Sequence, residues 1–318
     1  MSTKLKIFIA SALVAVGLII FALVMSALGW DFTKLNTSKY ETNTHEITDS
    51  FDDISINTDT ADIRFLPAQD GKCKVVCYEM EKVRHEVTVT EGILTVEAVD
   101  TRAWYDYIGI SFSTQTVTVY LPAGMYEKLL IRSDTGHVEL PNDFSFGELD
   151  IEVSTGDVNF NASVTGAVKI KASTGDVTVK GVTAGALDLS TATGGVTVSE
   201  ATVLGDIKVS TSTGSASISD TECGSLTSTA STGGIYLSST VASGSFSLEV
   251  GTGSIHFNAC DAAEIYARAG TGSVTGTLLS EKVFIATSST GTVDVPRGTS
   301  GGVCEITTGT GDIRLSID

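Results

Sequence analysis

The sequence predicts an all-β fold: a right-handed parallel β-solenoid with coils of about 19–20 residues, preceded by one N-terminal transmembrane helix. Three observations predict this. An uncharged apolar stretch lies near the N-terminus, the dipeptide Thr-Gly recurs at nearly constant spacing, and apolar residues alternate with polar ones on both sides of each Thr-Gly. A constant coil length with short strands in every coil is what stacked coils require.

The composition limits both the class of protein and the class of partner. The chain has 318 residues, 42% of them hydrophobic and 18% charged, with 32 Gly and a formal net charge of −18. A chain of this length can bury an ample core, which argues against overall disorder. The 38 acidic residues against 20 basic ones argue against nucleic acid, whose phosphates require positive charge, and against adsorption to anionic lipid headgroups.

Residues 7–30 carry no charge, and we predict a transmembrane signal-anchor helix there. At a rise of 1.5 Å per residue, this stretch crosses a hydrocarbon layer of ~30 Å. Lys4 and Lys6 precede it and Asp31 follows it, so residues 1–6 are expected in the cytoplasm and the bulk of the chain outside a single-pass cell-membrane anchor. A cleaved signal peptide is the alternative, although its apolar region is normally about 7–15 residues long. Either way the exported portion has a net charge of roughly −20.

The rest of the chain divides into a polar tether and an extracytoplasmic domain. Residues 31–46 lack apolar periodicity and are expected to tether the domain to the helix. The domain covers 47–318, in which 47–127 is predicted to hold a first coil and a hairpin-rich cap, and 128–318 the repeat solenoid. Such a cap would shield the strand edge on the membrane side, where exposed edges otherwise invite aggregation.

The repeat is defined by Thr-Gly dipeptides whose glycines lie 19 or 20 residues apart. The glycines are predicted to supply the positive φ that a tight turn demands. They are Gly136, Gly156, Gly175, Gly194, Gly214, Gly233, Gly253, Gly272, Gly291 and Gly311. Apolar residues lie two and four positions after most of these glycines, and a second apolar pair lies seven and five positions before them. This alternation with period two predicts two short strands in each coil, each with one buried face.

A copy of the repeat pattern that lacks the Thr-Gly dipeptide lies upstream. With Ala61 in the glycine position, residues 54, 56, 63 and 65 are all Ile or Phe. We therefore predict that the chain enters the solenoid here, leaves it through residues 70–125 and resumes at Leu129. An antiparallel meander folded into a sandwich is the alternative, but it would tolerate more variation in strand and loop length than the repeat shows.

Acidic residues follow the turn glycine at only three positions, Asp157, Asp176 and Asp312. They are weak candidates for a cation site, because a calcium-binding repeat would carry carboxylates in most coils. Turn chemistry is the favoured interpretation. The sequence shows no metal-ligand spacing and no carboxylate pair that can be placed for glycoside cleavage. We therefore predict no resident metal, no cofactor and no enzymatic activity.

The cysteines predict a protein without disulfide bonds. Cys73 and Cys77 lie on one strand face, about 13 Å apart, and Cys223 and Cys260 lie two coils apart, so neither pair can bond. Cys304 takes an inward apolar position and is expected to behave as a small hydrophobic residue. Stability must then come from the continuous core.

Several segments together resemble one family of bacterial surface proteins. They are the N-terminal anchor, FDDISINTDTADIRF, VTVYLPAGMYEKLLIRSDTGHVEL and the repeated STGDV. Over about residues 48–318 the chain is similar to the family called putative adhesins, a domain of unknown function. The resemblance implies a β-helix-like fold and an envelope location, and some relatives are linked to cell-envelope stress signalling in Gram-positive bacteria. It implies no catalytic residue.

These observations predict a membrane-anchored cell-surface binding or structural protein that presents an acidic solenoid rich in Ser, Thr and Gly. Its partners would be the membrane, through residues 7–30, and an unidentified surface, wall-polymer or protein ligand. The C-terminal end at 315–318 has no obvious cap, so this open edge is a candidate contact surface. The alternatives are an accessory or regulatory protein of an envelope stress-response system and, more remotely, a polysaccharide-active β-helix enzyme.

Overall fold

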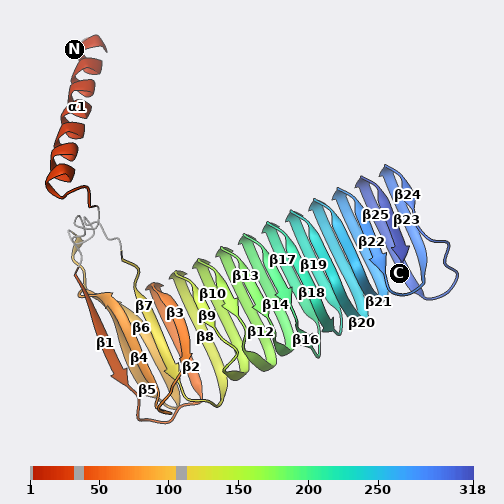
Figure 1. Ribbon diagram of the computed structural model, residues 1–318, viewed down its shortest axis with the longest axis horizontal. Helices are drawn as coiled ribbons and strands as arrows, with labels where there is room; N and C mark the ends of the chain where they lie inside the picture. Colours follow the sequence, from red (N-terminus) through yellow and green to blue (C-terminus); the bar gives the residue numbers. More distant parts are fainter. Residues whose placement is uncertain (1–2, 32–38, 105–112) are drawn as a thin grey trace.

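The structure is a computed structural model that describes residues 3–31, 39–104 and 113–318 (Figure 1). Its described strands belong to one 26-stranded sheet, wound into an elongated β-solenoid of about ten turns. Successive coils pair in parallel, and one apolar helix lies near the N-terminus. The predicted fold class is therefore confirmed.

Helix α1 (Thr3–Ala27) is long and apolar enough to cross a membrane by length and composition, over Leu5–Ala27. It begins and ends earlier than the predicted 7–30. The helix stops because Gly29 and Trp30 adopt positive φ angles of 68° and 58°, and the Trp30 amide bonds back to the Met25 carbonyl at 2.7 Å. Left-handed residues with backward amide bonds are the usual end of a helix.

Most solenoid strands fall into two series. The strands that lead up to the turns are β8 (Met125–Thr135), β10 (Ser145–Thr155), β12 (Ser163–Thr174), β14 (Thr183–Thr193), β17 (Ile207–Thr213) and β19 (Leu226–Thr232). The others are β9 (Val138–Leu140), β11 (Val158–Phe160), β13 (Val177–Lys180), β15 (Val196–Ser199), β16 (Thr202–Val203) and β18 (Ala216–Cys223). Further along the chain, β20 (Ile235–Thr252) and β21 (Ile255–Thr271) continue around a corner of the coil.

The coils have a third side that the sequence pattern did not predict, as in the repeat where β16 lies between β15 and β17. The additional side forms where a long strand bends, as at Gly147 in β10, where the register against β12 shifts between Phe146 and Leu149. A Cβ built on Gly147 would lie only 2.6 Å from the carbonyl oxygen of Glu127 in the previous coil. The corner therefore needs a residue without a side chain.

Inward side chains form continuous apolar rows along the solenoid. Ile151 pairs in register with Ile131 on one side and Ile170 on the other, and all three are fully buried. The strands that come after the turns carry equivalent apolar rows. All these rows together make one core that extends over the whole solenoid. Each buried Val, Ile or Leu contributes about 1.5–3 kcal/mol to folding, so the stack is held mainly by this core.

The upstream copy of the repeat around Ala61, which lacks Thr-Gly, forms a coil as predicted. The first coil consists of β2 (Asp53–Thr60) and β3 (Asp62–Pro67), which pair in parallel with β8 and β9. Ile54 lies opposite Leu129, and Ile63 lies opposite Val138. Ala61 takes the turn position and is fully buried.

The N-terminal cap covers the outer side of this first coil. It consists of β1 (Tyr40–Glu46), β4 (Lys74–Met80), β5 (Val83–Thr90), β6 (Ile93–Asp100) and β7 (Thr116–Leu121). β6 and β7 extend the first coil in parallel, whereas β4 pairs antiparallel with both β7 and β1. The predicted hairpin at Glu91-Gly92 is present as β5–β6, with both turn residues at positive φ.

The tether predicted over residues 31–46 extends too far toward the C-terminus. Residues 40–46 form β1, the outermost strand of the cap, because their backbone pairs with β4 from Tyr40 opposite Met80 to Glu46 opposite Lys74. Their polar sequence suits a strand at the edge of a sheet. Residues 32–38 lie outside the described part of the chain.

The C-terminal end differs from the prediction in its coil order. The last segments are β22 (Val274–Leu278), β23 (Lys282–Thr290), β24 (Val293–Asp294), β25 (Gly302–Thr310) and β26 (Ile313–Ile317). β25 lies between β21 and β23, and β26 lies between β22 and β24. The final stretch, 302–317, is therefore an inserted coil, and Lys282–Asp294 is the terminal coil. The edge predicted at 315–318 is only partly open: β26 pairs with β22 along Ile313–Ile317, and its ladder with β24 covers Ile313 and Arg314.

Glycines in the connecting loop make this insertion possible. A Cβ on Gly298 would overlap the Lys282 carbonyl oxygen, and one on Gly302 would overlap that of Ala263. Gly301 also adopts a φ of 92°, in the region that favours glycine. The loop can thus pass close to the backbone of two coils and deliver β25 between them.

We expect Gly175→Ala to destabilise the protein strongly. Gly175 has a φ of 139°, and a Cβ there would overlap the carbonyl oxygen of Gly156. The backbone strain alone is worth about 1–3 kcal/mol, and the overlap adds to it. Gly124→Ala is the matched control, since nothing lies within 4 Å of its Cβ position. Thermal unfolding of both variants followed by circular dichroism checks this, and equal melting temperatures would contradict it.

Candidate functional site

The Thr-Gly turns form a continuous row along one corner of the solenoid. The ten predicted turn glycines all have φ between 133° and 150°. A Cβ on Gly156 would overlap the Gly136 carbonyl oxygen, and the same contact recurs from coil to coil. The preceding threonines are also in register, as in the series Thr135, Thr155 and Thr174, and they are exposed.

At most turns, the side chain after the glycine links the turn to a neighbouring coil. Asp157 accepts a hydrogen bond from the Asp176 amide at 2.8 Å, and Asp176 accepts one from the Gly195 amide at 2.7 Å. Asp312 accepts a hydrogen bond from the Thr292 amide at 2.8 Å, and it lies between β25 and β26, several coils away from the other two carboxylates. The three weak cation candidates thus act as acceptors for turn amides, a role that Ser254 and Ser273 fill in other coils.

Alternating charges line one outer face of the solenoid. Asp150 lies between Arg132 and Lys169 on the neighbouring coils, with N–O distances of 3.1 and 3.7 Å. Lys171 pairs with Glu152 at 2.8 Å on the same face. Exposed pairs of this kind each contribute little stability. Their alternation in sign still favours one register, since like charges directly opposite each other would repel.

A buried polar cluster closes the inside of the N-terminal cap. Glu79 and His85 are 1% and 4% exposed, and a Glu79 carboxylate oxygen lies 2.7 Å from His85 Nδ1. The same oxygen accepts the His85 amide at 2.6 Å, while Asn43 donates to the other carboxylate oxygen at 2.8 Å. His85 Nε2 lies 3.0 Å from the Thr58 hydroxyl. Buried polar groups need such partners, and this cluster supplies them.

The Thr58 hydroxyl, the His85 imidazole and the Glu79 carboxylate follow one another in the order of a hydrolase catalytic triad. Thr58 is however only 3% exposed, and neither of the two cavities described below is lined by Thr58, Glu79 or His85. The arrangement therefore orders the interior of the cap. Sequence analysis missed it because its residues come from four strands and share no fixed spacing.

The terminal coil is the exposed end of the stack. Among the strands that the structure describes, none pairs with the outer edge of β23 or β24. The run from Val283 to Val293 has no charged residue, and Ile285 is 53% exposed. A cavity of about 340 Å³ opens beside Phe284 and Ile317, where the core reaches the end of the solenoid.

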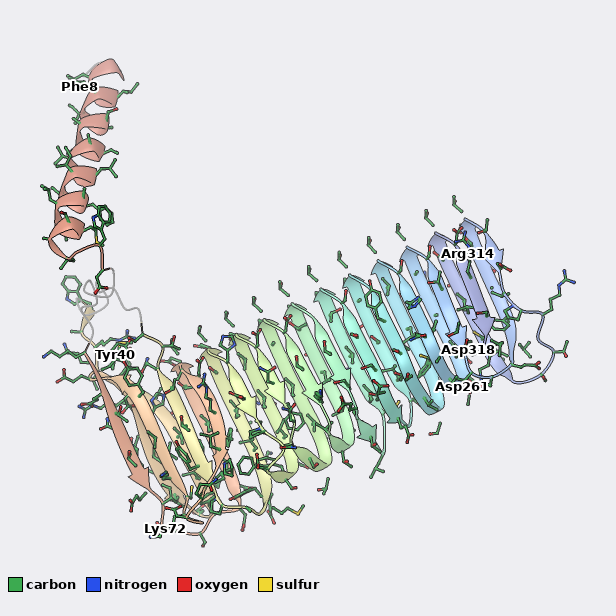
Figure 2. The ribbon with its side chains drawn as sticks, in the orientation of Figure 1. Phe8, Tyr40, Lys72, Asp261, Arg314 and Asp318 are labelled. Carbon is green, nitrogen blue, oxygen red and sulfur yellow. The ribbon has the colours of Figure 1, made fainter. Side chains whose placement is uncertain are left out.

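A second cavity, of about 490 Å³, lies at the corner of the cap that carries Lys72 (Figure 2). Phe51 and Tyr126 stack in its wall with ring centroids 5.8 Å apart. Burial raises the pKa of Tyr126 to about 12 and that of Cys73, which also lines this cavity, to about 11. Neither group ionises near neutral pH, so neither acts there as a nucleophile.

All five cysteines are free and buried, in agreement with the prediction. Burial raises the pKa of Cys304 to about 12, consistent with its inward position. The pKa of Cys77 also rises to about 12, through burial and then through the nearby Glu79 carboxylate.

Residues 51–238 match the family described as Toastrack DUF4097, and this match covers more than half of the chain. The chain belongs to the Toastrack DUF4097 family. The match spans the first coil, the cap strands β4 to β7 and the solenoid as far as the start of β20. No curated protein matches this Toastrack chain.

Several solved structures are similar to this Toastrack protein. A "putative adhesin" from Bacteroides fragilis is 15% identical, with a TM-score of 0.46, over 87% of this chain and 97% of its own. A "putative adhesin" from Parabacteroides distasonis is 15% identical, with a TM-score of 0.40, over 88% and 98%. A "putative lipid binding protein" from Parabacteroides distasonis is 13% identical, with a TM-score of 0.45, over 88% and 98%.

We expect acid to weaken the attachment of the terminal coil through Asp312. The hydrogen bond from the Thr292 backbone, followed by that from the Thr292 hydroxyl, lowers the pKa of Asp312 below its ordinary value of 3.8. The unfolded carboxyl binds a proton more readily, so this stabilisation is present above pH 3.8 and is lost as the pH falls through the folded-state pKa.

Asp312→Asn tests this expectation, since an amide keeps an acceptor but does not titrate. The melting temperature of the wild type should exceed that of the variant at pH 6, and the difference should shrink toward pH 3. A difference that is the same at both pH values would contradict the role assigned to the carboxylate.

Proposed function

We propose that this Toastrack protein is a membrane-anchored cell-surface protein that binds an extracellular polypeptide at its terminal coil. The edge of β23 from Val283 onward, which carries no charge and pairs with no other described strand on its outer side, is the observation that carries the proposal. Helix α1 would anchor the chain with residues 1–6 in the cytoplasm and the solenoid outside. The acidic solenoid would then act as a spacer and a binding surface, without catalysing a reaction.

The two ends of the solenoid differ in a way that supports binding at the distal end. At the membrane side, antiparallel strands cover the first coil, and the outermost strand β1 carries Glu41 and Glu46. Charges and coverings of this kind protect sheet edges from unwanted pairing. The terminal coil has neither a cover among the described strands nor a charge between Val283 and Val293.

The terminal coil also offers the two contacts that strand addition needs. Its outer backbone groups can pair with an extended partner, and side chains of that partner can enter the cavity beside Phe284 and Ile317. Phe284 and Ala286 point toward the core but are only partly buried, because no further coil stacks on them. A partner strand with alternating apolar residues would complete their packing.

Site-specific photo-crosslinking on intact cells tests this proposal. A crosslinking residue at Ile285, on the terminal edge, is compared with one at Thr197, exposed in the middle of the solenoid. We expect a polypeptide adduct from position 285 and none from 197. With the crosslinking residue kept at 285, a Val283→Lys change in the same strand should lower the adduct yield at least about tenfold, because a buried unpaired charge costs more than 1.4 kcal/mol.

Other outcomes separate the alternatives. Capture of a membrane sensor protein at position 285 would favour the accessory role in envelope stress signalling. Equal adducts at 285 and 197 would contradict a docking role for the edge. Release of wall-glycan fragments by the purified protein would contradict a purely binding or structural role.

A further inference from the structure

The cap cluster brings together three side chains of the types that bind transition metals. Cys77 and Glu79 are alternate residues of β4 and face inward, and His85 comes from the adjacent strand β5. The cysteine sulfur, a carboxylate oxygen and a ring nitrogen all lie within 4.8 Å of one another, and all three residues are buried. The antiparallel turn between β4 and β5, which pairs Met80 with Val83, creates this proximity.

The strand register points to a fourth buried side chain beside the cluster, that of Gln115. The register of β4 and β7 pairs Tyr78 with Thr116, so the next position places Gln115 opposite Glu79 on the inward face. Gln115 is 2% exposed, and within the described part of the chain its Oε1 has no hydrogen-bond partner. An unpaired buried oxygen is costly, and it is available as a ligand or as an acceptor for a bound water.

We propose that Cys77, Glu79 and His85 bind a divalent transition-metal ion, for which Zn²⁺ is the best match, with Gln115 completing the site directly or through water. Zn²⁺ takes sulfur, nitrogen and oxygen ligands in a tetrahedron, with bonds of about 2.0–2.3 Å. Ligand atoms around such an ion are about 3.4–3.6 Å apart. The three ligand atoms would therefore contract around the ion, while the 2.7 Å contact between Glu79 and His85 Nδ1 would widen.

The charge and proton balance of this site is favourable. On binding, the Cys77 thiol gives its proton to water, and the thiolate and the Glu79 carboxylate together neutralise the two charges of the ion. A neutral group is the form that a buried site tolerates. His85 keeps one proton, which moves to Nε2 and is donated to the Thr58 hydroxyl 3.0 Å away, leaving Nδ1 free for the metal. Such an outer hydrogen bond fixes the tautomer of a ligating histidine.

The ion would add a link between β4 and β5, whose ladder is short. Cys77 and Glu79 lie on β4, His85 on β5, and Gln115 directly precedes β7. β4 and β5 share only the Met80–Val83 pair in their ladder. A bound ion would therefore strengthen the attachment of β5 to β4 and stabilise the covered end of the solenoid. This inference is independent of the function proposed for the other end.

Metal analysis of the full chain in detergent micelles tests the site. Protein from cells grown with added zinc should carry close to one zinc ion per chain by mass spectrometry. After chelation, and partial unfolding to open the cap, Co²⁺ should give a thiolate charge-transfer band that Zn²⁺ abolishes. The melting temperature should rise when Zn²⁺ is restored.

Cys77→Ser and Cys73→Ser provide the matched comparison, since both replace an inward buried cysteine within the same cap. We expect Cys77→Ser to lose the charge-transfer band and the zinc-dependent rise in melting temperature, and Cys73→Ser to keep both. Glu79→Gln and His85→Gln should weaken Co²⁺ binding by at least about tenfold. If Cys77→Ser does not fold, these two variants decide the question.

Two results would overturn the proposal. One is a wild-type protein that carries no zinc and shows no band with micromolar Co²⁺. The other is a band that survives unchanged in folded Cys77→Ser, or in both Glu79→Gln and His85→Gln, since the metal would then be bound elsewhere.

Discussion

The structure depends on the contact between successive turn glycines. A Cβ on each turn glycine would overlap the carbonyl oxygen of the turn residue in the neighbouring coil, which is Ala61 in the first coil and a glycine in the others. This contact can repeat only if every coil returns to the same point, which suits turn glycines spaced 19 or 20 residues apart. Register between coils follows from it, and register in turn aligns the apolar rows of the core. Although few of its residues are charged, the protein can remain stable because its core, narrow in cross-section, runs continuously along the stack.

The polar groups of the solenoid serve the same alignment. Side chains such as those of Asp157 and Asp176 accept a hydrogen bond from the amide one coil further on, so these turns satisfy a donor of the next. Charges of opposite sign meet across coils at Asp150 and its basic neighbours. Neither set contributes much energy at the surface, but both oppose a slip in register. The acidic residues after the turn glycines therefore have a structural explanation in their hydrogen bonds.

The sequence predicted the features that repeat and missed those that occur once. The helix, the coils and the first coil around Ala61 followed from apolar patterns that are regular and strong. The third side escaped notice because its inward residues, such as Ala162 and Ala201, are small and alternate weakly. The insertion of β25 could not be foreseen, since Thr290 and Thr271 both fit the register of Thr310 equally well. The cap cluster was hidden for a related reason: long-range antiparallel pairing leaves no periodic signal in the chain.

The inserted coil gives the solenoid a mechanical property that its repeats alone would not. In a stack whose coils follow chain order, a force on the C-terminus peels away one coil at a time, breaking few hydrogen bonds at each step. Here the C-terminal strand β26 is held between β22 and β24, so the same force must shear two ladders together or first displace the terminal coil. The connecting loop, residues 295–301, keeps the terminal coil attached to the inserted coil. A solenoid under tension at this end would thus resist unravelling at the point where the force is applied.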